Sequence, residues 1–149
     1  ECAEYSIFKD LSGFSRQDEL RAYKEEFLVK YFAFSDNMNF DVYINDYLDN
    51  YIDSKNEAFM DDAIKDTYLE QFKKMLSFLD GNHLITDISI NRKNRLLAAY
   101  IGTTLALKEN PNITPKQIFT NKFIENAKSS GFYMLKENVE LVKNILLDR

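Results

Sequence analysis

The stretch from Ser89 to Asn110 constrains the fold of this 149-residue chain more than any other. After a cationic start, its apolar side recurs at intervals of three and four residues: Leu96, Leu97, Tyr100, Ile101, Thr104 and Leu105. This spacing predicts a helix with one apolar face. Between these positions stand small residues that allow neighbouring helices to approach closely: Ala98, Ala99, Gly102 and Ala106. Pro111 predicts that this central helix ends before it.

The same periodicity recurs along most of the chain. It predicts helices over residues 16–34 and 40–52, and a last helix over 135–146. A longer helix carries an apolar stripe from Met60 to Leu79 and is expected to end at Gly81. Thr114 before Pro115 is a typical helix start, so a further helix is expected there. Residues 1–14 are expected to hold the end of a preceding element and a loop, and residues 84–90 a short extended segment.

Composition agrees with long helices. Only 4 Gly and 2 Pro occur in 149 residues, which disfavours a turn-rich β architecture. The prediction is an all-α fold: a single compact bundle of about six helices with no significant sheet, formed by residues 1–149 as one domain. The 12 Phe and 9 Tyr, without any Trp, predict an aromatic core with tyrosine hydroxyls at its rim.

Cysteine and histidine usage limits the chemistry. Cys2 is the only cysteine and His83 the only histidine, so neither a disulfide nor a Cys/His zinc site forms within the chain. The single thiol fits a reducing compartment, and we expect a cytoplasmic location. No apolar run approaches the roughly 20 residues of a membrane span, so no membrane partner is expected. The chain has no initiator Met, which leads us to expect a fragment of a longer protein.

The net charge of −5 is unevenly distributed. Residues 1–80 hold 9 Lys and Arg against 18 Asp and Glu, whereas residues 81–149 hold 10 against 6. A basic half can meet phosphates, or it can meet the acidic half of the same chain. Charge alone leaves both interpretations open.

No catalytic constellation is evident from spacing. Neither GxGxxG nor GxxxxGK[ST] occurs. Asp61 and Asp62 form the densest carboxylate pair, but neighbouring helical positions point about 100° apart, which predicts a solvated helix start and not a metal site. His83 lacks a nucleophile or metal partner by spacing. We therefore expect no catalytic residue, no metal and no cofactor in this chain.

The cluster Arg92, Lys93, Asn94 and Arg95 is the one candidate site. Three cations at a helix start oppose the helix dipole, at a cost of a few tenths of a kcal/mol each. One interpretation is contact with the phosphates of a nucleic-acid backbone. The other is a structural staple, in which the cations pair with an acidic helix such as residues 16–34. The sequence slightly favours the staple, because half-buried arginines usually have an internal partner.

Three stretches share the pattern of one known family. The first is E-E-F-L-V-K-Y-F-A-F at 25–34, followed by Tyr43 and L-D-N-Y at 48–51. The second is K-N-R at 93–95, with Ala98 or Ala99, Gly102 and Leu105, and then N-P at 110–111. The third runs from L-K at 135–136 to I-L at 145–146. Together they resemble the prokaryotic family known as domain of unknown function 262, the GmrSD-type restriction and phage-defence proteins.

The resemblance implies a function that the residues alone do not. In such proteins an N-terminal ParB/sulfiredoxin-like domain with a D-G-Q-Q-R motif hydrolyses nucleotide and is linked to DNA nicking, and some relatives add an HNH-type nuclease domain. Neither motif occurs in this chain, which looks like the helical region that follows the first domain. The implied role is a non-catalytic helical module whose partners are the N-terminal domain of the same parent protein and DNA. The alternative is a stand-alone helical interaction module, such as an effector or inhibitor.

Overall fold

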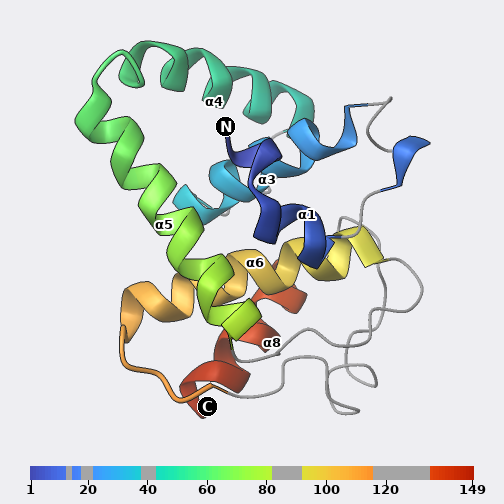
Figure 1. Cartoon of the computed structure of the whole chain (residues 1–149), viewed down its shortest axis with the longest axis vertical. Coiled ribbons are helices and arrows are strands. Elements are labelled where there is room, and N and C mark those ends of the chain that lie inside the picture. Colours follow the sequence, from blue (N-terminus) through green and yellow to red (C-terminus); the bar gives the residue numbers. More distant parts are fainter. Residues whose placement is uncertain (13–14, 18–21, 38–42, 82–91, 116–134) are drawn as a thin grey trace.

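The protein is an all-α bundle, as the sequence predicts (Figure 1). The computed structural model describes residues 1–12, 15–17, 22–37, 43–81, 92–115 and 135–149. No strand occurs in these residues. The elements are η1 Cys2–Glu4, α1 Ser6–Ser12, α3 Tyr23–Asp36, α4 Ile44–Ala58, α5 Asp62–Gly81, α6 Arg92–Glu109 and α8 Leu135–Leu147.

Helix α6 lies at the centre of the bundle. In Figure 1 it crosses the middle of the molecule, with α8 beneath it and α4 far above it. Helices α3, α5 and α8 all pack against it. Every residue from 96 to 104 is buried, so the prediction of a single apolar face is wrong. A helix buried on all sides is a core helix, and small residues fill the sides that the apolar ribbon does not.

Helices α6 and α8 approach one another closely at Gly102. A methyl group added at Gly102 would lie 2.7 Å from Val142 Cβ and 3.0 Å from the carbonyl oxygen of Val139. Gly102 is therefore required as the residue without a side chain at this crossing. The ends of the pair are joined by Glu109, which forms ion pairs with Lys143 at 3.3 Å and with Arg149.

The core around α6 is aromatic. Rings from four helices meet with centroid separations of 5.5–6.3 Å: Phe8, Phe27, Tyr31, Phe72 and Tyr100. We expected tyrosine hydroxyls at the rim of the core. Tyr31 and Tyr100 are instead fully buried, so this prediction is wrong for both. Burial of the Tyr31 hydroxyl is possible because it shares a 2.7 Å hydrogen bond with Thr104 Oγ1.

The N-terminal residues are part of the core, in contrast to the mixed segment expected from the sequence. Helix α1 places the fully buried ring of Phe8 in the aromatic cluster. Helix η1 supplies Glu4, which pairs with Lys9 at 2.8 Å and with the buried Lys24 at 3.4 Å. Both lysines lower the pKa of Glu4, and the largest cause is the hydrogen bond from Lys9. The segment is too short for periodicity to predict it.

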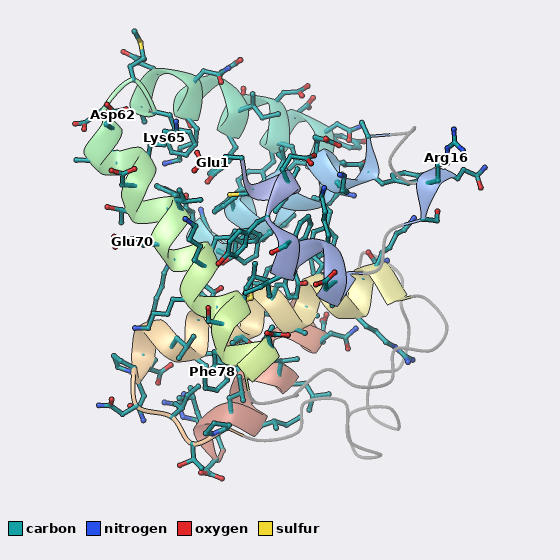
Figure 2. All side chains as sticks on the ribbon, in the orientation of Figure 1. Glu1, Arg16, Asp62, Lys65, Glu70 and Phe78 are labelled. Carbon is teal, nitrogen blue, oxygen red and sulfur yellow. The ribbon has the colours of Figure 1, made fainter. Side chains whose placement is uncertain are left out.

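Three predicted helix boundaries also differ. Residues 16 and 17 are helical, but Ala22 adopts a left-handed conformation at φ 55°, so α3 begins only at Tyr23 and the single helix predicted from residue 16 is wrong. Helix α4 starts later than predicted and continues to Ala58. Helix α5 begins at Asp62, labelled in Figure 2, which agrees with the helix start predicted at Asp61 and Asp62. Its end at Gly81 and the end of α6 before Pro111 are confirmed.

The expectations for residues 84–90, for His83 and for the helix after Pro115 lie outside the described residues.

Replacing Gly102 by Ala is expected to destabilise the protein. The new methyl group overlaps Val142, and overpacking of this kind costs about 1–3 kcal/mol. The gain in helix propensity, about 1 kcal/mol at most, offsets only part of this. Urea unfolding monitored by circular dichroism measures the difference. Gly81→Ala is the matched control, because nothing lies within 4 Å of its added methyl group, and a loss of stability equal to that of Gly102→Ala would contradict the packing argument.

Replacing Tyr31 by Phe is expected to produce a pH-dependent loss of stability. At neutral pH it leaves Thr104 Oγ1 buried without this partner, at a cost of about 1–3 kcal/mol. Burial raises the pKa of Tyr31 from 10.0 to about 12. The unfolded wild-type chain therefore releases this proton before the folded chain does, and wild-type stability falls as the pH rises from about 10 to about 12. The variant has no phenol to titrate at this position. The difference in unfolding free energy between wild type and variant should therefore narrow between about pH 10 and about pH 12. A stability difference that stays constant over this pH range would contradict the prediction.

Candidate functional site

The basic cluster lies at the start of α6, as its sequence predicts. Arg92 is the first residue of the helix, and Asn94 is half-buried in its first turn. The ammonium of Lys93 lies 4.1 Å from the ring centroid of Tyr23, the first residue of α3. Lys93 thus makes a cation–π contact with residues 16–34, the acidic segment with which the staple interpretation pairs the cluster.

Arg95 behaves differently from Lys93. It is half-buried, and its Nε is enclosed by protein without a hydrogen-bond acceptor. The other half-buried or buried cations of the described chain all have partners. Four of them pair with carboxylates at 2.8–3.7 Å: Lys24, Lys30, Lys55 and Lys143. Lys73 lies 5.5 Å from the ring centroid of Tyr5. Arg95 is the exception among them.

The two interpretations of the cluster therefore apply to different residues. Lys93 fits a staple, because it connects α6 to α3. Arg95 does not fit one, since no carboxylate or carbonyl of the described residues accepts from its Nε. A guanidinium has five donors in a fixed planar geometry that matches phosphate and carboxylate oxygens. Because this Nε is enclosed, an anionic group outside this part of the chain would meet only the terminal nitrogens of Arg95.

A second polar group, which the sequence does not predict, surrounds the carboxylate of Asp36 at the end of α3. The hydroxyls of Tyr51 in α4 and Tyr68 in α5 both donate to Asp36 Oδ2, at 2.9 and 2.7 Å. Lys55 Nζ lies 3.7 Å from the same oxygen and 4.9 Å from the centroid of the Tyr68 ring. We call Asp36, Tyr51, Lys55 and Tyr68 the Asp36 cluster. Three helices meet in it.

The chemistry of the Asp36 cluster is structural. Burial and the hydrogen bond to Asp36 raise the pKa values of Tyr51 and Tyr68. Contact with Tyr68 and the charge of Asp36 raise the pKa of Lys55. Both phenols therefore stay protonated and the ammonium stays charged at neutral pH, which suits donors that hold a carboxylate and not groups that transfer protons. The only sequence signal was the spacing of four between Tyr51 and Lys55, which places them on one helical face.

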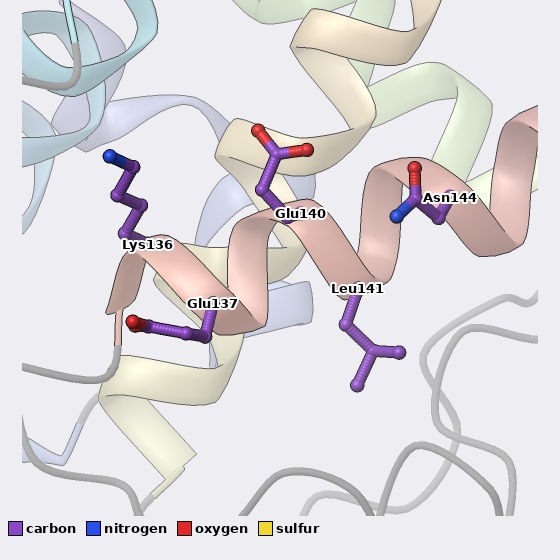
Figure 3. Close-up of a pocket in the computed structure, with 5 residues that line it drawn as sticks. All are labelled: Lys136, Glu137, Glu140, Leu141 and Asn144. Atoms are coloured by element: carbon purple, nitrogen blue, oxygen red, sulfur yellow. The ribbon is translucent and has the colours of Figure 1, made fainter.

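The two hollows lined by described residues do not gather reactive groups. Figure 3 shows the larger one, about 440 Å³, whose five lining residues all belong to α8. In this view the carboxylates of Glu137 and Glu140 point away from one another. A smaller hollow of about 260 Å³ lies between α5 and α6, where Lys74 and Lys108 stand at exposed positions. Neither hollow combines a nucleophile with a base.

The carboxylates do not converge on a metal site either. No group of three or more His, Cys, Asp or Glu side chains with metal-site geometry occurs among the residues that the structure describes. Asp61 and Asp62 lie at the start of α5, as predicted, and Asp61 Oδ1 accepts a hydrogen bond of 2.9 Å from the amide of Ala63. This contact caps the helix. None of the described helices combines the length and apolarity needed to cross a bilayer.

Comparison with known proteins adds no relative. No protein-family model, curated protein or solved structure matches the chain. The resemblance to the domain of unknown function 262 family therefore depends on the quoted residues alone.

The contact between Lys93 and Tyr23 is expected to contribute measurable coupling energy. A double-mutant cycle with Lys93→Met and Tyr23→Leu isolates this pair from other contacts of Lys93. For an exposed cation–π pair we expect a coupling of about 0.5–1 kcal/mol, measured by urea unfolding. Lys108→Met in place of Lys93→Met is the control, since Lys108 lies in the last turn of α6. Additivity of the Lys93 and Tyr23 variants would show that the contact does not bind α6 to α3.

Proposed function

We propose that this chain is a non-catalytic helical module of a bacterial defence or restriction-type nuclease or NTPase. In this role it supports the N-terminal nucleotide-hydrolysing domain of the parent protein and contacts DNA through Arg95 and its neighbours at the start of α6. The module itself hydrolyses nothing. The observation that carries the DNA contact is the half-buried guanidinium of Arg95, which follows Arg92 and Lys93 in the first turn of α6 and whose Nε has no acceptor among the described residues.

The arrangement of the family-like stretches supports a module of this kind. The first stretch lies in α3 and in and just before α4, the second in α6 and the turn after it, and the third in α8. These helices pack on one another, and the close crossing of α6 and α8 uses Gly102, one of the residues that carry the resemblance. The shared residues are therefore mostly those that build a scaffold. A scaffold without converging reactive groups suits a supporting role better than a catalytic one.

The surroundings of Arg95 favour an anionic partner. Arg92 and Lys93 precede it within one turn, and the start of a helix adds a partial positive charge. An arrangement of this kind is unfavourable unless an anion is present, because like charges repel and the dipole opposes them. Phosphate oxygens match the planar donors of a guanidinium. A nucleic-acid backbone is the partner that supplies such oxygens in a row.

The alternative is a stand-alone module that binds a protein. It is favoured by the large exposure of Tyr43 and Met60, each 85% accessible, which flank α4. Exposed apolar side chains of this size occur at protein interfaces, although single ones are common on any surface. The two functions differ in their salt dependence, because only the phosphate contact releases counterions.

Replacing Arg95 by Met tests the proposed DNA contact. Met keeps an apolar stem and removes the charge and the donors. We expect the intact chain to bind a fluorescein-labelled DNA duplex, and the variant to bind more weakly, with a slope of log affinity against log salt smaller by about 1. Fluorescence anisotropy at several salt concentrations measures both quantities.

Two controls separate the interpretations. Lys108→Met removes a cation from the far end of α6 and should leave the salt slope unchanged. Urea unfolding of Arg95→Met should show little loss of stability, because no described residue accepts a hydrogen bond from the Arg95 Nε. If Arg95→Met lowers stability and leaves the slope alone, Arg95 is a staple and the proposal is wrong. Absence of DNA binding by the wild-type chain would favour the protein-binding alternative.

A further inference from the structure

The attachment of α4 to the rest of the protein is unusual for a helix of 15 residues. Only one of its residues, Leu48, is buried. Its largest packing contact is with α3, where Tyr47 stacks on Phe34 with ring centroids 5.4 Å apart. By contrast, α6 is buried along most of its length. The apolar contribution to holding α4 in place is therefore small, since it scales with the area removed from water.

Polar contacts hold α4, and most of them reach the last turn of α3 or the residue after it. The Tyr47 hydroxyl donates to the carbonyl oxygens of Ala33 and Asn37, at 3.0 and 2.7 Å. One turn further along α4, the Tyr51 hydroxyl donates to Asp36 Oδ2, and Lys55 lies within ion-pair distance of the same oxygen. Each successive contact is four residues along, so one face of α4 makes them all.

Asp36 also connects α4 to α5, because the same carboxylate oxygen accepts from Tyr68. Tyr68 in turn packs on Phe59 in the corner between the helices, with ring centroids 5.2 Å apart. One oxygen atom thus holds the C-terminal half of α4 and the first turns of α5 against α3. Hydrogen bonds to a charged group are the strong ones, and they are lost together when that group is removed.

We propose that α4 is a detachable arm that Asp36 latches, and that it opens locally while α3, α6 and α8 stay folded. Proteins open in cooperative units, and the units with few buried apolar contacts open first. Helix α4 meets that description and the aromatic core does not. Among the described helices, the arm is the one that a binding partner can displace at least cost. This proposal does not depend on the DNA contact of Arg95.

Hydrogen exchange of the intact chain tests the latch. Asp36→Asn keeps the size of the side chain and removes its charge, which weakens three contacts at once. We expect the amides of residues 51–58 in the variant to exchange about tenfold faster or more, while those of residues 96–104 keep their wild-type rates. Mass spectrometry of peptides after exchange at neutral pH measures both sets.

The matched control is Asp49→Asn, on the opposite side of the same helix. Asp49 is exposed and makes no ion pair or hydrogen bond with the described residues, so its variant should exchange like the wild type. Tyr68→Phe, which removes one donor only, should accelerate the same amides as Asp36→Asn by a smaller factor. This milder variant keeps the test valid if Asp36→Asn folds poorly.

Two results would overturn the proposal. Unchanged exchange of residues 51–58 in both Asp36→Asn and Tyr68→Phe would mean that the cluster does not latch α4. Equal acceleration of residues 51–58 and 96–104 would mean that α4 does not open separately from the core.

Discussion

The fold depends on the contact between α6 and α8 at Gly102. Because this residue has no side chain, Val142 and the backbone of α8 come close enough to bury α6 on a side that its large apolar residues do not cover. On another side of α6, the ring of Tyr100 packs against Phe8 of α1 and against Phe27 and Tyr31 of α3. A bundle in which one helix is enclosed by the others needs a small residue at such a crossing, since interiors pack without room for an extra methyl group.

The enclosure of α6 decides where polar groups are tolerated. Within the core, the Tyr31 hydroxyl is accommodated through its hydrogen bond with Thr104, whereas Ser35 Oγ and Thr103 Oγ1 lack partners among the described residues. At the outside of the bundle, hydrogen bonds and ion pairs take the place of apolar packing. Helix α4 is held by tyrosine hydroxyls and an ion pair around Asp36, and η1 by the pairing of Glu4 with Lys24. Apolar packing therefore defines the centre, and charged hydrogen bonds position the periphery.

Periodicity was sufficient to predict the all-α class and the central position of the residues around Gly102, while Gly81 and Pro111 predicted the ends of α5 and α6. It failed where the cause of the local structure is not a repeat in the sequence. Ala22 interrupts a helical pattern with a left-handed conformation that no local residue requires, and α1 is too short to show a repeat. Burial of α6 on all sides follows from its neighbours and not from its own sequence. The Asp36 cluster joins residues up to 32 positions apart, so spacing within one helix cannot reveal it.

For the candidate site, the sequence placed the cations at the start of α6 but could not distinguish their roles. Lys93 and Arg95 are two residues apart and have the same charge, yet one contacts an aromatic ring and the other has an Nε without an acceptor. The comparison with Lys24, Lys30, Lys55 and Lys143 is what gives this difference weight. Because those cations are complemented inside the chain, the fold is able to supply carboxylates where it buries charge. The Nε of Arg95 has no acceptor among the described residues, and this difference is why the DNA contact is proposed at Arg95 and not at Lys93.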